Sequence, residues 1–132
     1  MRITRFAAGD DGRSEFSEVD VRYPLTIEAA EGAQLAGSAA FDSPGVQFID
    51  LPDGLDLGLH PVPRRQFVFV IDGHVEIGTA DGELLRFSPG DVILADDVGT
   101  TGHTTRAIDG PVQLLYVPLP QSGPPLFEPR RG

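Results

Sequence analysis

The sequence predicts an all-β protein built as a sandwich or barrel of short strands. Sixteen Gly and twelve Pro interrupt the 132 residues every few positions, and no segment keeps a long helical periodicity. Short β-branched and aromatic runs recur between these turn residues. Two Asp-Gly pairs, Asp72-Gly73 and Asp81-Gly82, separate such runs. Regular short strands joined by turns of this kind are typical of antiparallel sandwiches and barrels.

Strand patterns fill the region between residues 46 and 118. Asp-Gly supplies the positive φ angles of a type I′ turn, so 66–87 is predicted to form a three-stranded antiparallel meander. The predicted strands cover 46–51, 57–60, 66–71, 74–79, 84–87, 91–95, 103–108 and 112–118.

Residues 66–71 have no polar face. Gln66, Val68 and Val70 alternate with Phe67, Phe69 and Ile71, whereas an antiparallel strand with one wet face should alternate apolar with polar. We therefore expect one face to line a barrel interior. The other face should pack on another sheet, on the N-terminal segment or on a second subunit. This pattern favours a homodimer, with cover by the same chain as the alternative.

The segments outside the predicted barrel show weaker patterns. Residues 7–18 are polar and acidic, which predicts a loop, and 27–38 allows a short helical turn. The Pro-rich tail 119–132 is predicted to be extended or disordered. Alternatively, it straps across a partner through Leu126 and Phe127.

Length and charge exclude several classes of protein. The chain is long enough for one domain, predicted over 1–118, with its barrel in 46–118. The net charge of −10 argues against nucleic-acid binding and against an anionic membrane surface. All ten basic residues are Arg, so Schiff-base chemistry through lysine is excluded.

The absence of cysteine removes disulfides, thiolate nucleophiles and cysteine-ligated zinc. Residues 1–16 contain no apolar leader pattern, and no segment approaches the roughly 18 apolar residues needed to span a membrane. The expected location is the cytoplasm.

The stretch 86–103, "RFSPGDVILADDVGTTGH", carries a resemblance to a known family. A Pro-Gly-Asp turn, an apolar strand, a loop and then a histidine, His103, resemble the second motif of the cupin superfamily. The resemblance covers about 46–118. It implies a small jelly-roll barrel, also called a double-stranded β-helix.

The resemblance also implies positions for the first cupin motif, which has two histidines, a glutamate and a closing glycine. Placing that glycine on Gly73 puts the glutamate position on Gln66 and the histidine positions on His60 and Val62. The family site holds Fe, Mn, Ni or Zn with three imidazoles and a carboxylate. The implied metal ligands here are His60, Gln66 and His103. Val62 cannot ligate a metal, and Gln66 offers only a neutral oxygen.

Two acids precede the motif histidine. Asp96 and Asp97 follow an apolar strand, and His103 opens the next one. One reading is that a carboxylate replaces the missing glutamate and completes a site of two histidines and one carboxylate. The other is that Asp96 or Asp97 fixes the tautomer of His103 in a metal-free acid–base pair. An ordinary role in a turn is the alternative for both acids.

Further candidates lie on the neighbouring strands. Arg64 and Arg65 precede Gln66 and are suited to clamping an anionic substrate, and Arg64 faces inward if the strand is regular there. Solvated arginines are the alternative. Tyr116 supplies either a phenol to the cavity or core packing.

These residues predict a small-molecule enzyme with its pocket at the barrel mouth. The chemistry would be acid–base, as in isomerases, cyclases or lyases, or metal-assisted, and the arginines allow an anionic substrate. The alternative is a barrel of the same fold that binds a small ligand without turning it over.

Overall fold

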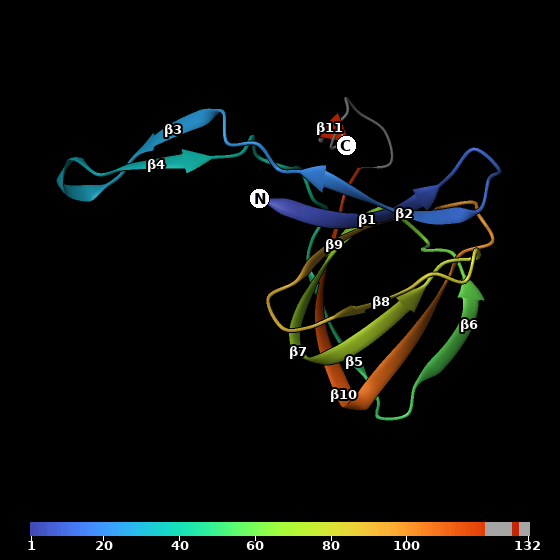
Figure 1. Ribbon diagram of the computed structural model, residues 1–132. Coiled ribbons are helices and arrows are strands. Elements are labelled where there is room, and N and C mark those ends of the chain that lie inside the picture. The colour runs from blue at the N-terminus through green and yellow to red at the C-terminus, as the bar shows by residue number, and fades with distance from the viewer. Residues whose placement is uncertain (121–127, 130–132) are drawn as a thin grey trace.

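The structure, a computed structural model, describes residues 1–120 and 128–129. In this part of the chain, nearly all regular structure is β-strand (Figure 1). The strands are β1 (Arg2–Ala8), β2 (Ser14–Asp20), β3 (Leu25–Glu28), β4 (Gln34–Gly37), β5 (Gln47–Leu51), β6 (Asp56–His60), β7 (Gln66–Gly78), β8 (Leu84–Phe87), β9 (Val92–Asp96), β10 (His103–Pro118) and β11 (Glu128–Pro129), with one short 3-10 helix, η1 (Ala30–Gly32).

Most of these strands form one curled sheet. Its order is β11-β2-β1-β9-β7-β10-β5, with β6 added to β10 and β8 added to β7. The pair β1–β9 is parallel, and the other pairs are antiparallel. The long strands β7 and β10 bend, so the sheet wraps around an apolar interior (Figure 1). The predicted all-β barrel is confirmed.

The predicted hairpin turn at Asp72-Gly73 is wrong. Residues 66–78 form the single strand β7, which pairs along both of its halves with β10 and changes register near the middle. Gly73 has a φ of 80°, and a Cβ there would clash with the carbonyl oxygen of Pro111. The positive φ that Asp-Gly favours therefore serves a bulge in a bent strand and not a chain reversal. The predicted strands 103–108 and 112–118 likewise merge into β10.

The second Asp-Gly pair does form a hairpin, between β7 and β8. Its geometry differs from the predicted type I′ turn, because Gly82 has a positive φ of 89° and Asp81 does not. The Gly82 amide donates to the Thr79 carbonyl at 3.0 Å, and the Thr79 amide donates to the Glu83 carbonyl at 2.9 Å. This is a type I turn followed by a glycine bulge.

The expected loop over 7–18 is also wrong, because β1 and β2 form a hairpin there. β1 joins the barrel directly through its parallel pairing with β9, in which Phe6 lies opposite Ala95. The first strand residue of β2, Ser14, is buried. Because Ser14 is polar, a pattern based on apolar residues does not show that this residue faces inward.

Two apolar clusters stabilise the barrel. The interior cluster contains Val68 and Val70 of β7, and the outer cluster contains Phe67. Ile3, Val19, Leu94 and Leu119 complete the buried part of the outer cluster. At the start of β7 the same chain therefore covers both faces, with Val68 in the interior cluster and Phe67 in the outer cluster. Farther along the strand, Ile71 is exposed.

The remaining segments lie outside the barrel wall. β3 and β4 form a separate hairpin that projects from the barrel (Figure 1). The helical turn allowed over 27–38 is limited to η1. In the tail, β11 pairs with β2, while Leu126 and Phe127 lie outside the described residues. No helix in the described chain is long and apolar enough to cross a membrane.

Candidate functional site

A buried aspartate–histidine pair joins the end of β9 to the start of β10. Nδ1 of His103 lies 2.6 Å from Oδ2 of Asp97. The connection between them folds back tightly, because the Thr100 amide and hydroxyl both donate to the Asp97 carbonyl, at 3.1 and 2.8 Å. Asp97 is fully buried, and only 4% of His103 is exposed.

Two further donors hold the Asp97 carboxylate. The Ser14 hydroxyl donates to Oδ2 at 2.8 Å, and the Val62 amide donates to Oδ1 at 2.9 Å. Burial raises the pKa of Asp97, but the hydrogen bonds from His103, Val62 and Ser14 outweigh it and hold the pKa below the usual value of 3.8. Asp97 is therefore ionised near neutral pH and acts as an acceptor.

This acceptor fixes the tautomer of His103. An ionised carboxylate can only accept a hydrogen bond, so Nδ1 of His103 carries the hydrogen. In the neutral ring, Nε2 is then the unprotonated nitrogen and a proton acceptor.

His60 lies beside His103 on the neighbouring strand β6. The two residues are paired in the sheet, and their ring centroids are 4.6 Å apart with a tilt of 52°. The two histidines are therefore strand neighbours and do not face each other across the barrel. Nδ1 of His60 lies 2.7 Å from the Gly58 carbonyl, which can only accept, so Nε2 of His60 is also unprotonated in the neutral ring. Glycine at position 102 permits the close approach of these strands, because a Cβ there would clash with the His60 backbone.

Phe6 also packs against His103. The phenyl and imidazole centroids are 4.4 Å apart, so the His103 ring contacts the rings of both Phe6 and His60. Phe6 itself is almost fully buried. The imidazole is therefore shielded from water on the side that faces β1.

Asp96 lies apart from this pair. Its Oδ2 accepts hydrogen bonds from Arg5, at 2.7 Å from Nη2 and 3.1 Å from Nε, and lies 3.5 Å from Nε of Arg65. Neighbouring residues at the end of a strand point to opposite faces, so only one of the two acids reaches His103. That residue is Asp97.

The predicted substrate-binding residues lie at different depths. Arg64 is exposed on the outside of the barrel and lines a cavity of about 280 Å³ together with Pro44, Gly45, Val46, Gln47 and Pro118. The condition under which Arg64 would face inward is not met, because regular strand geometry begins only at Gln66. Arg65 is engaged by Asp96.

Gln66 and Tyr116 both belong to the interior side. Gln66 is buried and alternates in phase with Val68 and Val70 of the interior cluster. Tyr116 packs against the same cluster, and its burial raises the pKa of the phenol. The phenol therefore stays protonated up to a higher pH than that of an exposed tyrosine.

The residues present do not fit the metal site that the cupin resemblance implies. Among the described residues, no group of three or more His, Asp or Glu is arranged to hold a metal ion. Asp96 is held by Arg5, and Asp97 binds the Nδ1 side of His103, so neither can join its Nε2 on a shared metal. The implied ligand set therefore consists of His60, His103 and the weak neutral donor Gln66, and it lacks a carboxylate.

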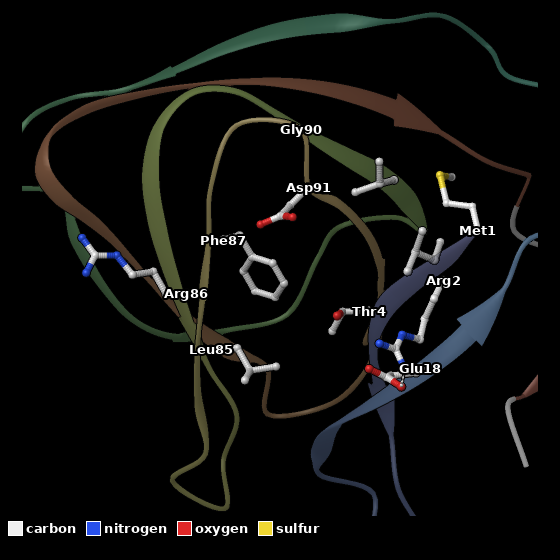
Figure 2. A pocket seen from close by; sticks show the side chains of 11 residues that line it. Met1, Arg2, Thr4, Glu18, Leu85, Arg86, Phe87, Gly90 and Asp91 are labelled. Carbon is white, nitrogen blue, oxygen red and sulfur yellow. Dashed lines mark ion pairs between the residues drawn. The ribbon is translucent and has the colours of Figure 1, made fainter. Parts of the chain in front are cut away.

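A cavity of about 400 Å³ lies elsewhere, between β1, β2, β8 and the turn before β9. Phe87 and Asp91 line one side, and Arg2 and Glu18 line the other (Figure 2). Arg2 and Glu18 form an ion pair at 3.4 Å. His60, Asp97 and His103 do not contribute to its lining.

Sequence reasoning missed two residues of the histidine site. Ser14 and Phe6 come from the first sixteen residues, which carried no recognised motif. Their contribution depends on β1 crossing the end of the barrel beside β9, a long-range pairing that no local pattern encodes. Residues 14–20 carry no strand signal in the sequence, because their apolar residues, Phe16 and Val19, do not alternate with the polar ones.

Comparisons with known proteins find similarity in solved structures. No profile of a known protein family matches the chain, and no curated protein matches it. A protein of unknown function from Streptococcus pyogenes is 27% identical over 64% of this chain and 72% of that one, with a TM-score of 0.47.

Two further solved structures have names that refer to the fold. An uncharacterized protein with a double-stranded β-helix domain from Klebsiella pneumoniae is 18% identical over 80% of this chain and 91% of that one, with a TM-score of 0.48. A sugar phosphate isomerase from a cupin superfamily, from Silicibacter pomeroyi, is 18% identical over 91% of this chain and 71% of that one, with a TM-score of 0.47. These likenesses are of fold and carry no assignment of activity.

Proposed function

We propose that the protein is a small-molecule enzyme that transfers protons through His103 without a metal ion. The observation that carries this proposal is the 2.6 Å hydrogen bond between Nδ1 of His103 and the buried carboxylate of Asp97. A histidine whose tautomer is fixed by an ionised carboxylate is a common general acid–base unit.

The proposed step follows from the protonation states. Nε2 of His103 takes a proton from a substrate C–H or O–H group, and the ring becomes an imidazolium. The positive charge forms next to Asp97, and burial of the pair strengthens their attraction. Returning the proton to a different substrate atom gives an isomerisation, and loss of a leaving group gives a lyase reaction.

The remaining groups have supporting roles in this proposal. Ser14 and the Val62 amide keep Asp97 ionised and in place. Because Phe6 packs against the His103 ring, the proposed substrate approach is along the ring edge that carries Nε2, next to the half-buried His60. Gln66 and Tyr116, on the interior face, are the proposed polar contacts of the substrate. Of the two candidate arginines, exposed Arg64 is the one proposed to attract an anionic substrate, because Arg65 is engaged by Asp96.

A second function has its own support. The barrel interior is filled by apolar side chains, and the cavity of about 400 Å³ lies away from the two histidines. These observations favour a barrel that binds a small ligand without turnover. In that case, the Asp97 network stabilises the barrel end and has no catalytic role.

Solvent-exchange NMR distinguishes these functions even when the substrate has not been identified. Small carbonyl compounds with an acidic C–H group, including 2-oxo acids and aldose phosphates, are incubated with the protein in D₂O. Loss of a substrate proton signal reports proton abstraction. We expect exchange with the wild type, and a loss of about 10²–10⁴-fold in the His103→Asn variant.

The matched control is His74→Asn, since His74 bonds to Ser88 and lies outside the site. It should exchange like the wild type. Exchange that persists unchanged in His103→Asn would contradict the proposal. Thermal stabilisation by a compound that shows no exchange would favour the ligand-binding function.

A further inference from the structure

The hairpin β3–β4 has one entirely apolar face. Ile27 and Leu35 lie directly opposite each other, and Leu25 lies two residues before Ile27, so the three side chains share one side of the ribbon. Each is about half exposed. We call this set of three side chains the arm face.

The opposite side of the hairpin is mostly polar. Thr26 lies opposite Ala36, and Glu28 lies opposite Gln34, whose side chains are hydrogen bonded. The hairpin is therefore an amphipathic ribbon. Within the described chain, β3 and β4 pair only with each other, and the ribbon stands clear of the barrel (Figure 1).

A ribbon of this kind requires a surface to pack against. An isolated two-stranded hairpin is only marginally stable in water, and an exposed cluster of large apolar side chains marks an interaction site. The arm face contains no charged residue, so an apolar and uncharged surface fits it best.

The same chain carries such a surface on the outer side of the barrel. Val46 and Phe48 are 64% and 76% exposed. Phe48 lies opposite Leu115, which lies opposite Phe69, so an apolar row crosses β5, β10 and β7. We call the surface formed by Val46, Phe48 and Leu115 the Phe48 surface. Exposed Ile71 extends it along β7.

The segment that connects the hairpin to β5 packs on the outer side of the barrel. Phe41, within that connection, packs edge-on against Phe67 of the outer cluster with centroids 5.3 Å apart. β5 is also the terminal strand of the described sheet order, with one edge unpaired. An apolar region thus extends from the outer cluster to an open sheet edge.

We propose that two copies of this chain exchange their arms, with the arm face of each copy packed on the Phe48 surface of the other. Because each copy carries both complementary surfaces, one two-fold axis satisfies both pairs at once. A different protein partner would cover one surface and leave its counterpart bare. The net charge of −10 on each copy makes the association stronger at high salt.

Cross-linking tests the contact directly, because the chain contains no native cysteine. Ile27→Cys and Phe48→Cys are purified as separate single-cysteine proteins, mixed and oxidised. We expect a disulfide-linked heterodimer, identified by mass spectrometry of the joined peptides. The matched control replaces Ile27→Cys with Thr26→Cys, which lies on the polar side of the same strand. It should give at least about tenfold less product, since a disulfide needs Cβ atoms that point toward each other and the Cβ of Thr26 points away from the arm face.

Sedimentation of the full chain supplies the second readout. The wild type should be a dimer, and the combined Ile27→Ser and Leu35→Ser variant should be a monomer. Thr26→Ser should stay dimeric. The barrel should still unfold in a cooperative transition in all three proteins, because the hairpin lies outside the barrel wall.

Three outcomes would overturn the proposal. These are a monomeric wild type, a dimer that survives loss of the arm face, and equal cross-linking of the Ile27→Cys and Thr26→Cys proteins to the Phe48→Cys protein.

Discussion

His60 and His103 are paired residues on neighbouring strands, and each has its Nδ1 atom engaged by an oxygen acceptor. His60 donates to the Gly58 carbonyl at 2.7 Å, and His103 donates to Asp97 at 2.6 Å. Both neutral rings therefore have an unprotonated Nε2 atom. Two adjacent imidazoles in this state can accept protons, but they provide too few donors for the metal site of the cupin pattern.

Replacing Asp97 by asparagine should destabilise the protein. The change removes a buried charge that accepts three hydrogen bonds, from Ser14, Val62 and His103. We expect a loss of about 2–4 kcal/mol in the free energy of unfolding. Urea denaturation measures it, with Asp96→Asn as the control. Asp96 is partly exposed, so its loss should cost roughly 1 kcal/mol or less. Equal costs for the two variants would refute the distinction between the two acids.

The same carboxylate should make stability depend on acid pH. The folded-state pKa of Asp97 lies below its unfolded value of 3.8. Its ionised form therefore stabilises the fold fully above about pH 5, and this contribution is lost as the pH falls through the lowered pKa. Denaturation between about pH 6 and pH 2.5 should show a smaller acid decrease for Asp97→Asn than for the wild type. An identical decrease in both proteins would contradict the lowered pKa.

Gly73 should tolerate alanine worse than other glycines of similar conformation. Gly73 and Gly99 have φ angles of 80° and 77°, but only at Gly73 would a Cβ meet another strand, at Pro111. Gly99→Ala should cost about 1–2 kcal/mol from its positive φ alone. Gly73→Ala should cost about 1–3 kcal/mol more because of the steric clash. Chemical denaturation of the two variants side by side tests whether β7 and β10 cross as closely as described.

Metal analysis should give a negative result. We expect protein purified without an affinity tag to hold no near-stoichiometric Fe, Mn, Ni or Zn, and His103→Ala to match the wild type. The physical reason is the missing carboxylate, since Asp97 binds the Nδ1 side of His103 and Asp96 binds Arg5. Elemental mass spectrometry after incubation with each metal measures this. A stoichiometric metal that disappears in His103→Ala would show that the site rearranges to bind it.

Local sequence patterns were sufficient for most barrel strands. Segments such as 84–87 and 91–95 alternate or run apolar between turn residues, and β8 and β9 follow them closely. The Asp-Gly pair at Gly73 could not be interpreted correctly, because a positive φ suits a bulge as well as a turn. The choice depends on whether β10 lies alongside, which is a long-range property.

Only part of the candidate site could be predicted, because the rest also depends on long-range strand pairing. The proximity of His103 to an acid follows from their short separation along the chain. Which acid it contacts depends on the strand register, and a shift of one residue exchanges Asp96 and Asp97. The contribution of Ser14 required the pairing of β1 with β9, which brings the N-terminal hairpin to this end of the barrel.

The most direct test of the account is the tautomer of His103, because the proposed proton transfer needs a hydrogen on Nδ1 and a free Nε2. Long-range ¹H–¹⁵N NMR distinguishes the two nitrogens at a pH where the ring is neutral, and the chain has only three histidines to assign. We predict the Nδ1–H form in the wild type and a shift towards the Nε2–H form in Asp97→Asn. A wild-type protein with its hydrogen on Nε2 would contradict the role assigned to Asp97 and, with it, the proposed base.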